Sequence, residues 1–125
     1  MVARAALLAA AVVAAGVAVH GLRRASACEH STGRLIAAIA ARGELGAPAR
    51  AVSDDCDATR DLVGAAVRLT AARDRRDAVA LSRRATQRAP RDYLGWVALG
   101  RILPAGDPEA RRALQRAREL APPVR

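Results

Sequence analysis

The chain has 125 residues, which gives room for one domain. Hydrophobic residues make up 52% of it, but many are alanine and aromatics account for only 2%, so the composition disfavours a β-sheet and favours an all-α fold of closely packed helices. The net charge of +9 comes from arginine, since no lysine occurs; we attribute this to coding bias in a GC-rich genome, and the scarcity of stacking aromatics argues against nucleic acid as a partner.

The stretch from Ala5 to Leu22 carries no charged side chain, and its length suits a bilayer-spanning helix. A buried helix of a soluble protein is disfavoured, because so small a domain cannot surround a helix that is apolar on every side. Ala25-Ser26-Ala27 resembles a signal-peptidase site, but the charges of Arg23 and Arg24 argue against cleavage. We therefore expect residues 1-24 to form a single-pass anchor that enters the membrane through residues 5-22, with a cleaved signal peptide as the alternative.

Residues 25-58 are expected to form a helical hairpin of their own. Helical spacing of apolar residues predicts a first helix over Ser31 to Arg42, and a second from Ala49 to about Asp55. The glycines and the proline between Gly43 and Pro48 predict the turn that joins them.

Two cysteines flank this hairpin, and antiparallel helices would place Cys28 beside Cys56. A disulfide there would close a loop of about 28 residues and stabilise the fold by about 3 kcal/mol in the loop-entropy picture. Such a bond persists in an oxidising compartment, so it predicts a domain outside the cytoplasm. Two buried free thiols are the alternative, whereas a metal site of Cys28, His30 and Cys56 is rejected because structural zinc needs four ligands.

Residues 59-125 predict two more helical hairpins. The expected helices run from about residue 58 to 72, from 74 to 89, through Tyr93 and Trp96, and from Pro108 to about Pro122. Asp107 followed by Pro108 is a favoured helix start, and we expect Trp96 to be a core wedge between the hairpins. Two further sets complete this picture: cap candidates for the first of these helices, Ser53, Asp54, Asp55 and Asp57, and a solvated arginine face, Arg76, Arg83, Arg84 and Arg88.

A short pattern occurs twice in this region. The spacing of Ala78, Ala85 and Pro90 recurs in Ala110, Ala117 and Pro122, and the second copy also contains Trp96, Leu99 and Gly100 ahead of Ala110. The pattern resembles the tetratricopeptide repeat, in which small residues let paired helices approach and proline ends the second helix. The first copy matches less fully, with Leu62, Ala65 and Ala66 where the family has Trp and Leu-Gly.

The resemblance implies a binding scaffold whose inner surface is lined by the first helix of each pair. When the family's inner positions are transferred to this sequence, they hold mostly valine and leucine. Such side chains do not suit clamping of a terminal carboxylate. They leave an apolar groove edged by two arginines. Either a protein or peptide partner fills this groove, or the Cys28 to Cys56 hairpin packs against it. The implied partner-binding residues are Arg60, Val63, Val67, Leu94, Val97 and Arg101.

We expect no enzyme activity and no cofactor, because the only histidines are His20 and His30 and no glycine-rich phosphate loop occurs. The predicted function is that of a membrane-anchored docking module on the extracytoplasmic side, binding another protein of the cell envelope. The alternative starts from charge: residues 59-125 hold fifteen arginines against seven acids, so this face could adsorb to anionic lipid or wall polymers. Adsorption would weaken steeply with salt, whereas an apolar contact would not.

Overall fold

The computed structural model describes residues 2–124, and over that range the fold is all-helical without a β-strand. The all-α expectation is therefore confirmed. The helices come close to the positions that apolar periodicity predicts. Six are present in the described range: α1 (Val2–Ala40), α2 (Gly46–Asp55), α3 (Thr59–Ala71), α4 (Arg75–Arg88), α5 (Tyr93–Ile102) and α6 (Pro108–Leu120).

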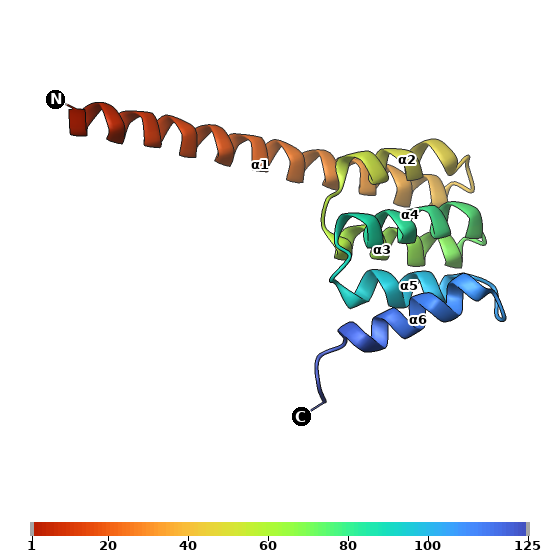
Figure 1. The fold of residues 1–125 in the computed structure, drawn as a ribbon. Coiled ribbons are helices and arrows are strands. Elements are labelled where there is room, and N and C mark those ends of the chain that lie inside the picture. Colours follow the sequence, from red (N-terminus) through yellow and green to blue (C-terminus); the bar gives the residue numbers. More distant parts are fainter. Residues whose placement is uncertain (1, 125) are drawn as a thin grey trace.

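Helix α1 is the longest element, with 39 residues, and its N-terminal half projects far beyond the other helices (Figure 1). Within the described residues it is the helix long and apolar enough to cross a membrane, and the apolar window is 0% buried. The prediction that a separate helix begins at Ser31 is wrong, because α1 continues without a break through that position. No proline or capped end occurs between Leu22 and Ser31, so nothing in the local sequence stops the helix.

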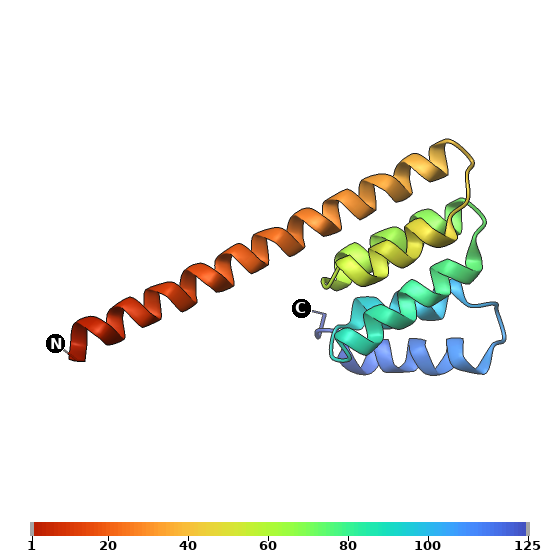
Figure 2. The ribbon, with the colours of Figure 1, turned by 90° about the horizontal axis from the view of Figure 1, so that it is seen from above.

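The helices pack in consecutive pairs, α1 with α2, α3 with α4 and α5 with α6. Helix α3 also contacts α1 and α5, while α2 contacts α4, so the pairs stack side by side. Figures 1 and 2 show that the turns within the pairs lie at one end of the stack. The α2–α3 and α4–α5 connections and the C-terminal end lie at the other, from which the N-terminal half of α1 projects. We call this end the base of the helical domain.

Leucine and alanine fill the core. Leu35, Leu62 and Leu69 are fully buried at the contacts of α1 and α3, and Leu81 is buried on α4. Alanine is common among the remaining buried residues, so helix axes lie close together, as the composition predicts.

Glycine allows the closest approaches, both on α5. A β-carbon at Gly95 would meet the backbone of Ala85 and Thr86 at 3.3–3.4 Å. One at Gly100 would lie 2.5 Å from Cγ of Leu114 and 3.1 Å from the carbonyl oxygen of Ala110. Helix α5 is therefore pressed against α4 on one side and against α6 on another.

Aspartates begin the last three helices. Asp74, Asp92 and Asp107 each accept a hydrogen bond from a backbone N–H in the first turn of the helix that follows, and Pro108 follows Asp107 as predicted. The cap candidates proposed for α3 are wrong, because Ala58 occupies that position without a side-chain cap. Asp57 instead pairs with arginines of other helices.

Trp96 is half-buried and packs against the core from the first turns of α5. Its indole Nε1–H donates a hydrogen bond to the carbonyl oxygen of Pro90 at 3.0 Å. The ring borders a hollow shared with Glu109 and Arg112 of α6, so it is not the buried wedge between hairpins that was expected. The bond to Pro90 fixes the ring at the entry of α5 instead.

Candidate functional site: a tethered anchor helix and an apolar docking surface

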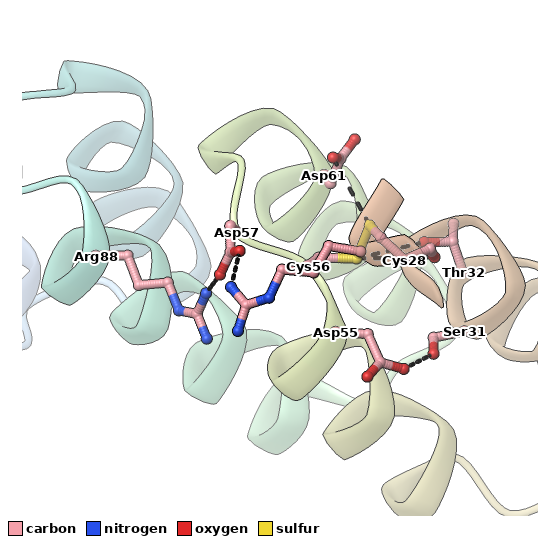
Figure 3. Close-up of a disulfide and its surroundings, with 9 residues drawn as sticks. Cys28, Ser31, Thr32, Asp55, Cys56, Asp57, Asp61 and Arg88 are labelled. Carbon is pink, nitrogen blue, oxygen red and sulfur yellow. Dashed lines mark hydrogen bonds and ion pairs between the residues drawn. A yellow bond between two sulfur atoms is a disulfide. The ribbon is translucent and has the colours of Figure 1, made fainter. Parts of the chain in front are cut away.

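The first candidate site is the junction at which α1 is joined to the rest of the domain. Cys28 and Cys56 lie at disulfide-bonding distance, with their Cα atoms 4.7 Å apart, so the predicted pairing is confirmed (Figure 3). Cys56 is completely buried, and the hydroxyl of Thr32 lies 3.9 Å from its sulfur. The bond joins the middle of α1 to the end of α2, and it uses both cysteines of the sequence.

Polar contacts surround this bond. The carboxylate of Asp57 forms ion pairs with Arg24 of α1 and Arg88 of α4, and Ser31 donates a hydrogen bond to Asp55. Figure 3 shows Arg88 reaching across to Asp57 beside the disulfide. Helices α1 and α4 therefore meet the α2–α3 connection at one carboxylate, and Arg24 follows Leu22, the end of the apolar segment, by two residues. We call the disulfide and this ion-pair bridge the anchor junction.

The arginine face of α4 was expected to be solvated, but two of its arginines form ion pairs with other parts of the domain. Arg88 belongs to the anchor junction, and Arg83 forms a two-pronged ion pair with Glu109 of α6, with N–O distances of 2.9 and 2.6 Å. Hydrogen bonding to the Arg83 guanidinium lowers the pKa of Glu109 below its ordinary value of 4.5. This pair links the second and third hairpins at the surface.

We expect Glu109→Gln to lower the free energy of unfolding by about 0.5 kcal/mol at neutral pH, because both partners are substantially exposed. A carboxylate with a lowered pKa in the folded state stabilises the fold above its unfolded pKa, and that contribution disappears as the pH falls through the folded value. The difference between variant and parent should therefore shrink once the pH falls below the ordinary value of 4.5 and vanish once the pH is below the lowered pKa of the folded state. Guanidinium unfolding at a series of pH values, followed by Trp96 fluorescence, measures it; a difference that persists in acid would contradict it.

A second carboxylate is shifted in the opposite direction. Burial, together with the neighbouring charge and hydrogen bond of Asp74, raises the pKa of Asp77. A raised pKa means that ionised Asp77 costs stability at neutral pH and that the cost is relieved as the pH falls. Arg50 of α2 offsets part of it.

The second candidate site is the surface of α3 and α5. Arg60, Val63 and Val67 lie on α3, while Leu94, Val97 and Arg101 lie on α5, and the two helices contact each other. Val67 is 57% exposed and Leu94 40% exposed, so both side chains present apolar surface to solvent. Helix α1 of the Cys28 to Cys56 hairpin packs beside α3 but leaves Val67 open, whereas Val63 and Val97 are half-buried. We call these six residues the docking surface.

Hollows flank the docking surface on both sides. One of about 370 Å³, between α5 and α6, is lined by Val97 and Arg101 together with Tyr93, Leu114 and Arg118. Another, of about 260 Å³, lies between α1 and α3 and is lined by Ile36, Ile39 and Arg68 among others. Sequence reasoning did not place Ile36, Leu114 and Arg118 near the site, although the i, i+4 spacing of Tyr93, Val97 and Arg101 could have indicated one continuous strip.

Basic side chains border this apolar strip. Among the described residues, none of the ion pairs involves Arg60, Arg68, Arg101 or Arg118. By contrast, Arg24, Arg83, Arg88 and Arg116 each have an acidic partner. The positive charge that is not neutralised within the domain therefore includes the arginines along the docking surface.

Comparison with protein-family models, with curated proteins and with solved structures finds no match. What the chain does must therefore be inferred from the anchor junction, the docking surface and the long apolar helix. The anchor junction is covalent and largely polar, which suits a fixed joint. The docking surface is apolar and open, which suits binding.

Proposed function

We propose that this protein is a single-pass membrane protein whose helical domain docks an amphipathic segment of another protein, one that presents apolar and acidic side chains. The observation that carries the proposal is the open apolar surface of α3 and α5, with Val67 57% and Leu94 40% exposed between arginines that have no acidic partner among the described residues. Apolar contact would supply affinity, and the arginines would select acidic partners.

The order of helix contacts supports the resemblance to tetratricopeptide repeats. The first helix of each pair contacts the first helix of the next, α1 with α3 and α3 with α5. In a scaffold of that kind these first helices line the binding face. Val63, Val67, Leu94 and Val97 lie on α3 and α5, so the proposed docking surface follows from the same arrangement.

The anchor junction supports a location outside the cytoplasm. Disulfides persist in oxidising compartments and are rare among cytosolic proteins. The apolar segment of α1 has the length to hold the domain at a membrane. A docking module of the cell envelope, facing away from the cytoplasm, accounts for both features.

Photo-crosslinking in intact cells tests the proposal directly. A photoreactive amino acid at Val67 should give one discrete adduct with a partner protein, and the same residue at Gln87, an exposed position of α4, should give none. Adding Arg101→Glu should weaken the Val67 adduct about tenfold, because it reverses a charge facing the acidic partner. Adducts of equal strength at Val67 and Gln87, or an adduct that Arg101→Glu leaves unchanged, would refute specific docking at this surface.

A further inference from the structure

The base of the domain lies level with the end of the apolar segment. Arg24 follows Leu22 by two residues, which is about 3 Å along a helix axis. Arg24 pairs with Asp57, and Asp57 pairs with Arg88 in the last turn of α4. The end of α4 is therefore held within side-chain reach of the point at which α1 would leave the hydrocarbon layer. Each headgroup layer of a bilayer adds about 5–7 Å beyond that point.

The α4–α5 connection comes directly after Arg88, and both ribbon views place it at the base (Figures 1 and 2). Pro90 and Arg91 of this connection are exposed, and so is Tyr93, the first residue of α5. Asp92 is the one acid in the connection, and its carboxylate is engaged as the cap of α5. Arg91 forms none of the ion pairs found among residues 2–124. An exposed cation and an exposed aromatic residue therefore lie at the base of the domain.

The chain has one tyrosine and one tryptophan, and both are at this end of α5. Tyrosine and tryptophan favour the headgroup region, where one part of the ring is apolar and another is wet. Side chains lean toward the N-terminus of their helix, so Tyr93 in the first turn of α5 leans toward the base. The turns at the opposite end, around Arg42, Arg73 and Gly106, contain no aromatic residue.

We propose that the α4–α5 connection is a lipid-contacting element, in which Arg91 binds the phosphate of anionic lipid headgroups while Tyr93 seats at headgroup level. Arg23, next to Leu22 on α1, adds a second cation at the same height. The inference rests on the proposed membrane anchoring of α1 but not on the docking of a partner protein. It gives the protein a second point of contact with the leaflet beside α1, which would limit the tilt of α1 and the domain together.

Trp96 reports on this contact in the unmodified protein, because its indole is bonded to Pro90 in the connection. The full chain is reconstituted in vesicles of phosphatidylcholine, with or without phosphatidylglycerol, that carry a nitroxide either on the headgroup or deep in the acyl chains. We expect stronger quenching of Trp96 by the headgroup nitroxide, increased further by phosphatidylglycerol. Arg91→Gln should reduce that further increase about fivefold, and Tyr93→Ser should reduce quenching in both lipids.

Arg111→Gln is the matched control, since Arg111 is an exposed arginine in the first turn of α6, at the opposite end of the domain. It should leave quenching unchanged. Flotation of the same vesicles separates the two proposals: a chain that does not float with them refutes the membrane anchoring. A chain that floats but whose Trp96 is quenched equally with and without phosphatidylglycerol, or equally in Arg91→Gln and its parent, refutes the lipid-contacting element alone.

Discussion

Removing the Cys28–Cys56 disulfide lowers the free energy of unfolding of the domain by about 3 kcal/mol, the largest effect we expect from a change at one site. The bond closes a loop with a sequence separation of 28, which spans the end of α1, the turn and the whole of α2. Without it, the unfolded chain regains the freedom of that loop. Replacing the completely buried Cys56 by alanine avoids leaving a new polar group in the core.

Guanidinium unfolding of the full chain in mild detergent, followed by Trp96 fluorescence, measures this effect for Cys28→Ala/Cys56→Ala against the parent. Reductant should shift the parent toward the variant and should leave the variant unchanged. A parent whose unfolding midpoint is insensitive to complete reduction would contradict the predicted contribution of the bond. Thiol labelling with and without reductant confirms that reduction is complete.

Placing a large side chain at Gly95 is the second change with a large expected effect. A β-carbon there would already meet backbone atoms of Ala85 and Thr86 at 3.3–3.4 Å, and backbone cannot rotate away as a side chain can. Gly95→Leu should therefore push α5 from α4 and cost about 2–3 kcal/mol, even after the better helix propensity of leucine is counted. The same fluorescence assay measures it.

Gly33→Leu is the control for that substitution. Gly33 lies in the interior of α1, within the folded part of the domain, and a β-carbon there meets nothing within 4 Å. The same chemical change should stabilise the domain by about 0.5–1 kcal/mol, because glycine is a poor helix former. Equal losses at Gly95 and Gly33 would show that close packing of α5 on α4 is not the cause.

Much of the fold could be predicted from local signals. Apolar periodicity located the helices of the domain, Asp107 and Pro108 marked the start of α6, and antiparallel pairing brought Cys28 to Cys56. These features depend on residues close in sequence, or on one simple assumption about how two neighbouring helices pack. The uncharged N-terminal run of the sequence likewise indicated a helix long enough to cross a membrane, which is part of α1.

Two of the misjudged features depend on contacts between distant segments, and one depends on the local continuity of α1. Asp57 resembled a helix cap because it precedes a helix, but its carboxylate instead pairs with arginines of α1 and α4. A helix start was placed at Ser31 because the apolar spacing of the hairpin begins near it, whereas α1 continues through Ser31 because no residue there stops a helix. The place of Leu114 and Arg118 beside Val97 follows from how α6 crosses α5, which neither helix encodes alone.

Because α1 is uninterrupted, it determines the rotational orientation of the domain about the axis of this helix. Because a helix turns by about 100° per residue, a membrane-spanning α1 would fix the direction in which the docking surface faces relative to the lipid-facing sides of the same helix. Inserting one residue between Leu22 and Cys28 would rotate the domain by about 100° about the axis of α1 and would shift it by only about 1.5 Å along that axis. A neighbouring membrane protein that binds one side of α1 would therefore also determine the direction in which the docking surface faces.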